Sequence, residues 1–294
     1  MVMATHPSVL RQYCVKTETE AMEKTVPVIS VLMSIYNCEN TLNECIECLL
    51  AQTEKRWNCI ICDDGSTDKS SIIMSEWKKR FPEKFILLQN KSNKGLSYSL
   101  NRCLEKAEGE FVARMDGDDL CSPDRFEKEL GFLLKHPELD IVSTDMQCFD
   151  SDGIWGLKAY PTNPTTKDLV HGTPFCHAGC MVRTSAIINA GGYSEEDAYA
   201  RVEDYELWVR MYSLGFRGQN IHEPLYQMRD DRNAASRRKW KYRINEARVR
   251  FEAVKRLNLP KKMVVFALRP LILGILPGKM SSYLHRKKLK QEKG

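Results

Sequence analysis

The strongest constraint on the fold is one apolar run near the start of the chain. Residues 28–35 read Val-Ile-Ser-Val-Leu-Met-Ser-Ile, which is too continuously apolar for a strand with one face in water. Such a run is typical of a buried parallel strand. It predicts a sheet covered by helices on both faces, and 294 residues are ample for such a domain.

Strand-like and helix-like segments then alternate. We expect strands at 28–35, 57–63, 85–89 and 111–115, with helices at 40–52, 68–81 and 94–107 between them. This alternation predicts an α/β fold with a Rossmann-like, mostly parallel sheet and helices on both faces. A helix at 124–136, short strands near 141–144 and 179–182, and a helix at 204–214 are expected to complete the domain.

The chain divides by charge into an acidic body and a basic tail. Residues 237–294 contain 18 Lys and Arg but 3 Asp and Glu, whereas residues 1–236 contain 26 and 36. We therefore expect a polar leader at 1–26, an α/β domain at 27–236 and a basic amphipathic helical tail at 237–294. Apolar runs beside the tail's lysines favour an anionic membrane surface over a solvated face, and nothing in the tail indicates nucleic-acid binding.

The cysteines indicate the compartment and leave a zinc alternative open. The chain has 11 cysteines and no apolar signal core near its start, so we expect reduced thiols in the cytoplasm. The pairs Cys45/Cys48 and Cys59/Cys62 have the spacing of zinc ligands. Residues three apart on a strand face opposite sides, however, so Cys59 and Cys62 are expected to be buried instead.

Polar residues follow the first two predicted strands. Ligands of open parallel sheets bind outside the carboxyl ends of the strands. Tyr36, Asn37 and Glu39 follow the first strand there, and Asp63 and Asp64 follow the second. Carboxylates can accept hydrogen bonds from a nucleobase or a ribose, although a capped turn is the structural alternative. The glycine-rich loop of a dinucleotide site and a Walker loop are both missing from the sequence.

A denser acidic cluster follows the fourth strand. Asp116-Gly117-Asp118-Asp119 places three carboxylates within four residues. These charges repel one another unless a cation neutralises them, and oxygen ligands select Mg²⁺ or Mn²⁺, which typically bridge substrate phosphates. A solvated acidic turn is the alternative. We expect Asp116 and Asp118 to bind the metal ion.

A third acidic pair, Glu203-Asp204, begins the predicted helix late in the body. Carboxylates at a helix start commonly complement the helix dipole. Alternatively, one of them projects into the site as a general base.

Together, these motifs resemble the family 2 glycosyltransferases of the GT-A fold, which build bacterial polysaccharides from nucleotide sugars. The resemblance covers about residues 28–226, with the motifs in family order at 30–37, 63–68, 93–97, 116–119, 191–193 and 203–208. It implies that Tyr36, Asp63 and Asp64 contact the base and ribose, and that Asp204 is the base, with Glu203 second. The full set expected to bind the nucleotide sugar is Tyr36, Asn37, Glu39, Asp63, Asp64, Lys94, Asp116 and Gly117.

One departure from the family affects the metal. Many relatives carry a histidine shortly after the segment that corresponds to Leu225-Tyr226, and this chain has Met228-Arg-Asp-Asp231 there. Asp230 or Asp231 is a substitute candidate for the third ligand. His177 could touch a phosphate or the acceptor, or could be a core histidine.

The resemblance predicts an inverting glycosyltransferase that uses Mn²⁺ or Mg²⁺. It would move a sugar from a nucleoside-diphosphate sugar to a hydroxyl of a lipid-linked saccharide, at the cytoplasmic face of a membrane. Two alternatives are a nucleotidyltransferase, which normally needs a basic glycine-rich phosphate loop, and a binding protein without activity.

Overall fold

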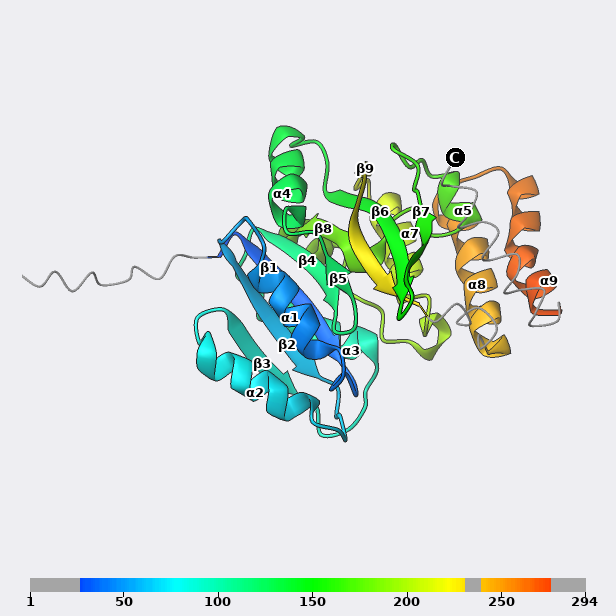
Figure 1. The fold of residues 1–294 in the computed structure, drawn as a ribbon. Helices are drawn as coiled ribbons and strands as arrows, with labels where there is room; N and C mark the ends of the chain where they lie inside the picture. The colour runs from blue at the N-terminus through cyan, green and yellow to red at the C-terminus, as the bar shows by residue number, and fades with distance from the viewer. Residues whose placement is uncertain (1–26, 231–238, 276–294) are drawn as a thin grey trace, which may run out of the picture.

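A sheet of nine strands runs through the described residues, 27–230 and 239–275, of this computed structural model (Figure 1). The strands are β1 (Ile29–Ile35), β2 (Trp57–Asp63), β3 (Phe85–Gln89), β4 (Phe111–Asp116), β5 (Leu120–Cys121), β6 (Ile141–Asp150), β7 (Gly153–Lys158), β8 (Cys180–Arg183) and β9 (Gly218–Arg229). Their order is β3-β2-β1-β4-β8-β6-β9-β5, and β7 pairs with β6.

The first four strands are parallel, and their carboxyl ends meet at one edge. In the pairing register, Ile35 of β1 lies beside Asp63 of β2, and Ser34 lies beside Asp116 of β4. Asp63 in turn lies beside Gln89 of β3. The predicted α/β fold is therefore confirmed, and both acidic clusters follow neighbouring parts of the same sheet edge.

The second half of the sheet has mixed directions and contains strands, β5, β7 and β9, that the sequence did not predict. β8 is antiparallel to both β4 and β6, whereas β9 is parallel to β6. β9 spans 12 residues, yet its pairing with β6 shifts between Thr144, opposite Ile221, and Met146, opposite Tyr226. Pro224 lies in the segment that bulges out, where a residue without an N–H group is tolerated. Because of this interruption, β9 lacks the regular alternation of apolar and polar residues that would predict a strand.

Helices cover both faces of the sheet, as predicted. Their bounds are α1 (Leu42–Leu50), α2 (Ser70–Arg80), α3 (Leu96–Leu104), α4 (Arg125–Lys135), α5 (Asp168–His171), α6 (Thr184–Asn189), α7 (Glu203–Ser213), α8 (Trp240–Arg256) and α9 (Arg269–Ile275), with 3-10 turns η1 (His177–Gly179), η2 (Asp197–Tyr199) and η4 (Lys261–Leu268). One apolar core joins the sheet to α1, α2 and α4, and a second joins it to α3, α6, α7 and α8. Cys59 belongs to the first core and Cys62 to the second, so these thiols face opposite sides of β2.

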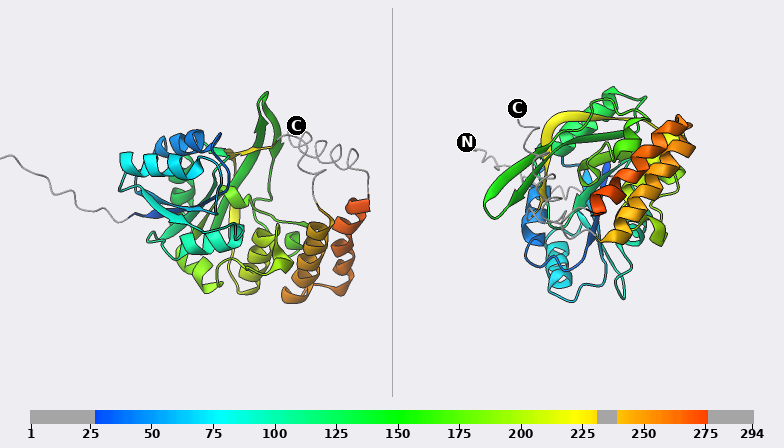
Figure 2. Two further views of the ribbon diagram at one scale, coloured as in Figure 1. Left: turned by 90° about the horizontal axis from the view of Figure 1, so that it is seen from below. Right: turned by 90° about the vertical axis from the view of Figure 1, so that its right-hand side faces the viewer.

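The described part of the basic tail is helical. α8 packs against α5 and α7, and α9 packs against α8, so that α8 and the shorter α9 lie side by side (Figure 2). Within residues 27–230 and 239–275, no helix has the length and apolar character needed to cross a bilayer. The predicted leader, and residues 237–238 and 276–294 of the predicted tail, lie outside the described part. The division at 27–236 stays a prediction.

Candidate active site

The loops after β1 and β2 are held together by hydrogen bonds. The Asn37 backbone N–H donates to Ser66 Oγ at 3.0 Å, and the Thr67 N–H donates back to Asn37 Oδ1 at 2.9 Å. Glu39 accepts from the Lys69 N–H at 3.1 Å. Asn37 has φ of 54°, a conformation that asparagine tolerates better than most residues. These contacts leave Tyr36 at the edge of the sheet with 48% of its surface exposed.

Asp63 and Asp64 are both buried, and their carboxylates accept bonds from within the chain. Asp63 Oδ1 accepts from the Ser66 N–H at 2.8 Å. Asp64 Oδ1 accepts from the Lys94 N–H, and Oδ2 from the Gly95 N–H, both at 2.8 Å. The predicted contacts of these carboxylates with base and ribose stay predictions. What the structure adds is that Asp64 holds the loop that carries Lys94, whose side chain is exposed.

Two glycines allow the loops to approach one another. A Cβ on Gly65, whose φ is +76°, would lie 2.7 Å from the carbonyl carbon of Ser92. A Cβ on Gly117 would lie 2.7 Å from Ile35 Cγ2. Side chains at these positions would therefore push the edge apart, since real Cβ atoms do not come this close to other carbon atoms.

Asp116 is anchored from below by a buried arginine that sequence reasoning missed. Arg114 is 2% exposed, and its Nη2 lies 2.5 Å from Asp116 Oδ1. Burial alone would lower the pKa of this guanidinium, but the charge of Asp116, its hydrogen bond and the nearby Tyr193 and Tyr226 together raise the pKa above its ordinary value. A charged residue inside the continuous β4 strand was the available signal. Asp116 remains 34% exposed at its side chain and so can still reach a ligand.

The other two carboxylates of the cluster differ from one another. Asp119 is 3% exposed and accepts from the Tyr226 hydroxyl and from the Arg229 N–H, both at 2.7 Å. Asp118 is exposed to solvent, although neighbouring protein atoms and the charge of Asp116 raise its pKa. Asp119 therefore supports the loop, while Asp116 and Asp118 face outward.

Asp116 and Asp118 fit a divalent cation that is shared with a ligand. They are two oxygen donors on one turn that reach solvent, which suits an ion whose other positions are taken by phosphates and water. Across residues 27–230 and 239–275, no three His, Cys, Asp or Glu side chains gather as a metal cluster. The structure therefore does not bring the candidate Asp230, which is 5% exposed, to these two carboxylates as a third ligand. Asp231 lies outside the described residues.

The predicted base lies in the first turn of α7. Asp204 is partly exposed, whereas its neighbour Glu203 is 8% exposed. Burial, followed by the charge of Asp204, raises the pKa of Glu203 to about 7. Arg201, just before the helix, has φ of 65°, and such strain in a residue other than glycine is common at functional sites.

Tyr193 is a buried tyrosine on which both Asp116 and Asp204 act. Burial raises the pKa of its hydroxyl, Arg114 opposes this, and the charges of Asp204 and Asp116 both add to the rise. Tyr193 is therefore within electrostatic reach of both carboxylates. Its hydroxyl lies 2.9 Å from His177 Nε2, and burial together with the Arg114 charge lowers the pKa of His177 well below 6.5. The His177 imidazole is therefore neutral and lies beside the Tyr193 hydroxyl.

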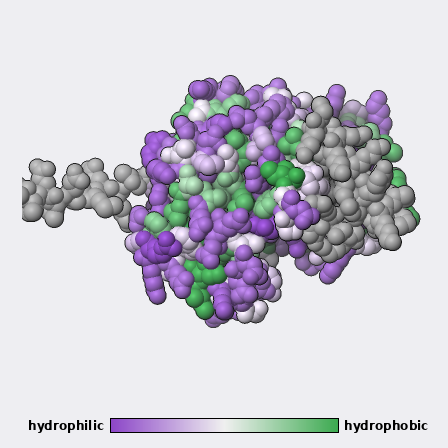
Figure 3. Space-filling view, viewed as in Figure 1, coloured by the Kyte–Doolittle hydropathy of each residue, from purple (hydrophilic) through white to green (hydrophobic). Residues whose placement is uncertain are grey.

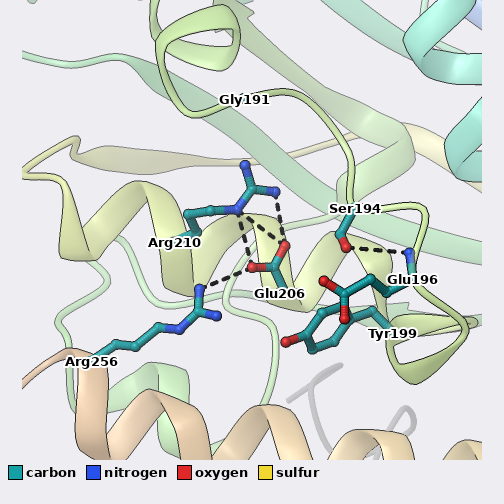
Figure 4. Close-up of a pocket in the computed structure, with 7 residues that line it drawn as sticks. All are labelled: Gly191, Ser194, Glu196, Tyr199, Glu206, Arg210 and Arg256. Carbon is teal, nitrogen blue, oxygen red and sulfur yellow. Dashed lines mark hydrogen bonds and ion pairs between the residues drawn. The ribbon is translucent and has the colours of Figure 1, made fainter.

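A pocket of about 280 Å³ lies behind this region, between α7 and the tail helix α8 (Figure 4). At its floor, Glu206 pairs with Arg210 at 2.8 Å and with Arg256 of α8 at 3.1 Å. Arg210 also donates to the Gly192 carbonyl at 2.7 Å, next to Tyr193. Glu206 thus ties α8 to α7 through Arg256, and none of the residues that line this pocket belongs to the acidic turns after β2 and β4.

Solved structures define the class of fold. Staphylococcus aureus TarS (residues 1–349), in complex with UDP-GlcNAc, has a TM-score of 0.65 at 19% identity, covering 82% of this chain and 72% of that chain. The mannosyltransferase PcManGT of Pyrobaculum calidifontis, in complex with GDP-Man and Mn²⁺, has a TM-score of 0.58 at 17% identity, covering 84% and 74%. The predicted GT-A fold is therefore confirmed.

Sequence relatives define the family. The model of glycosyl transferase family 2 matches residues 30–191. The putative glycosyltransferase EpsE of Bacillus subtilis is 41% identical over 267 residues, covering 91% of this chain and 96% of EpsE. The UDP-Gal:alpha-D-GlcNAc-diphosphoundecaprenol beta-1,3-galactosyltransferase of Escherichia coli is 28% identical, covering 92% and 99%. This chain belongs to glycosyl transferase family 2, and the prediction of a polysaccharide-building glycosyltransferase is confirmed.

Proposed function

We propose that this enzyme transfers one sugar from a nucleoside-diphosphate sugar to a hydroxyl of a lipid-linked saccharide, with inversion at the anomeric carbon. The observation that carries the proposal is the acidic turn at the carboxyl edge of the parallel strands, where the side chains of Asp116 and Asp118 reach solvent. The E. coli relative, named for a diphosphoundecaprenol acceptor, supports the lipid-linked class, and the UDP-GlcNAc of TarS supports the donor class. Family membership argues against a nucleotidyltransferase.

The donor is bound at the carboxyl edge of the parallel strands in this proposal. Tyr36 offers an exposed ring to the base, Asn37 and Glu39 shape the first loop, and Lys94 offers a cation. Asp63 and Asp64 accept hydrogen bonds from loop amides and so hold these loops in place. They are also proposed to contact the base and the ribose of the donor. The proposed binding surface is thus assembled before the donor arrives.

Asp116 and Asp118 would hold Mn²⁺ or Mg²⁺ at this edge, where Gly117 allows the turn to lie against Ile35. When bound, the ion would stabilise the negative charge of the departing nucleoside diphosphate. The Mn²⁺ of the mannosyltransferase supports a divalent ion in this fold. Arg114 keeps Asp116 in place beneath the turn.

Asp204 is proposed to accept the proton of the acceptor hydroxyl as the oxygen attacks the anomeric carbon. A single displacement of this kind inverts the configuration, because the attack comes opposite the leaving diphosphate. Glu203, with a pKa of about 7, lies beside it and is the second candidate.

Asp204→Asn tests the base. We expect the rate of sugar transfer or donor hydrolysis to fall by about 10² to 10⁴, since removal of a general base typically has this effect, while donor binding survives. Asp197→Asn is the control, because Asp197 lies shortly before α7 with its side chain 94% exposed. A wild-type rate in Asp204→Asn would reject this assignment and move it to Glu203.

A membrane surface is the second part of the proposal. Along α8, the exposed positions Lys241, Ile244, Arg248, Phe251 and Lys255 alternate basic and apolar residues. Their spacing of three or four residues puts them on one side of the helix. Further exposed apolar residues follow in η4 and α9, namely Val265, Phe266, Leu268, Ile272 and Ile275. By contrast, hydrophilic residues predominate on the described surface in the view of Figure 3.

Vesicle co-sedimentation tests the membrane surface. Arg248→Glu with Lys255→Glu should reduce pelleting with anionic vesicles at low salt, since each basic residue near such a surface contributes about 1 kcal/mol. Lys79→Glu with Lys106→Glu is the matched control, because these exposed residues lie on α2 and just after α3. Equal losses in both variants would indicate a general charge effect and contradict a surface on α8.

A further inference from the structure

Arg229 is the last residue of β9 and lies beside the metal-binding candidates. Its backbone N–H donates to Asp119 Oδ1 at 2.7 Å, and its guanidinium lies over the Phe149 ring at 4.5 Å from the centroid. Phe149 is itself 8% exposed, so the arginine rests on a buried support. Backbone and side chain together fix the guanidinium at the rim of the Asp116–Asp119 turn.

The guanidinium makes two further contacts there. Nε donates to the Asp118 carbonyl at 2.8 Å, and Nη2 pairs with Glu44 Oε2 of α1 at 2.7 Å. The side chains of Arg229 and Glu44 are 32% and 57% exposed. An ion pair this open to water contributes little stability and is readily exchanged for a stronger anion.

The surrounding charges favour such an exchange. The bond from Arg229 Nε to the Asp118 carbonyl places the positive charge of the guanidinium at the predicted metal site, beside the carboxylates of Asp116 and Asp118. Arg114, the other arginine described above, is buried and paired with Asp116. Arg229 is therefore a partly exposed cation at the place where a diphosphate is proposed to bind.

We propose that Arg229 binds the diphosphate of the donor and that Glu44 occupies its guanidinium edge until the donor arrives. The planar guanidinium matches a phosphate with two parallel N–H bonds, as it matches a carboxylate. Glu44 is thus a resident competitor of the substrate. This inference rests on the proposed function, because it assumes a nucleoside-diphosphate donor near Asp116 and Asp118.

Calorimetry of the full-length protein with Mn²⁺ and UDP, GDP or dTDP distinguishes this role from a purely structural one. Glu44→Gln should bind the preferred nucleoside diphosphate about two- to fivefold more tightly, because the competing exposed pair is lost. Glu47→Gln, which removes an exposed carboxylate from the same helix, should bind as the wild type does. Arg229→Lys should bind about tenfold more weakly, since the ammonium cannot form the paired bonds.

The double variant completes the test. In Glu44→Gln with Arg229→Lys, the gain from the first change should disappear, because the residue that it frees is gone. Unchanged or weaker binding in Glu44→Gln, at an unchanged melting temperature, would overturn the inference while leaving the proposed function intact. If the wild type binds none of the three nucleotides with Mn²⁺, the proposed function and this inference both fail.

Discussion

Two aspartate clusters at the same sheet edge have opposite surroundings. After β2, Asp63 and Asp64 are 0% and 3% exposed. Asp63 accepts from the Ser66 N–H of its own loop, and Asp64 accepts from the Lys94 N–H of the loop after β3. After β4, the side chains of Asp116 and Asp118 reach solvent, and partial burial followed by the charge of Asp116 raises the pKa of Asp118. In the first cluster, carboxylates build a binding surface, whereas the second keeps carboxylates available for a ligand.

The comparison shows that hydrogen-bond partners, more than residue type or position, decide what a carboxylate does. Asp119 illustrates this within the second cluster. It lies next to Asp118 in the chain, yet the Tyr226 hydroxyl and the Arg229 N–H satisfy it, so it supports the turn. A buried carboxylate with charged hydrogen bonds stabilises the fold, and an exposed one beside a like charge does the reverse.

The largest expected difference between the clusters is in activity. Asp118→Asn should lower the rate of donor hydrolysis or sugar transfer about 10²-fold or more, because loss of even an outer partner of a metal site weakens the site 10- to 100-fold. The measurement is release of nucleoside diphosphate at saturating Mn²⁺. A rate within twofold of the wild type would remove Asp118 from the metal site.

The next difference is in stability. Asp64→Asn should lower the free energy of unfolding by about 2 to 3 kcal/mol, since an amide nitrogen would face the Lys94 or Gly95 N–H and a buried charged bond would be lost. Urea denaturation measures this. If Asp64→Asn is as stable as the wild type, the first cluster does not hold its loops as described.

The smallest expected effect is a gain in stability, opposite in sign to the loss expected for Asp64→Asn. Without metal, Asp118→Asn should raise stability at neutral pH by less than about 1 kcal/mol, given the solvent exposure of the side chain. The raised pKa means that folding disfavours the charged form, so the contribution of Asp118 to wild-type stability falls as pH rises above its ordinary pKa of 3.8. The gain should therefore vanish at acid pH, and a gain independent of pH would contradict this cause.

How much the sequence predicts depends on the range of the contacts. The parallel strands and the acidic groups at their ends follow from local pattern, because apolar runs and the polar residues after them are adjacent in the chain. The bond between Tyr226 and Asp119 joins distant segments, and the pairing of Arg229 with Glu44 joins the end of β9 to α1. No local pattern signals these contacts, so the different roles of neighbouring aspartates could not be predicted.

Donor binding by Asp116 and Asp118 is proposed to need a divalent cation. Calorimetric titration of a nucleoside diphosphate into the full-length protein, with Mn²⁺ and with excess EDTA, measures this dependence. We expect binding with Mn²⁺, loss of most affinity in EDTA, and a similar loss in Asp118→Asn. Equal affinity under all three conditions would show that these carboxylates do not bind the donor through a metal ion.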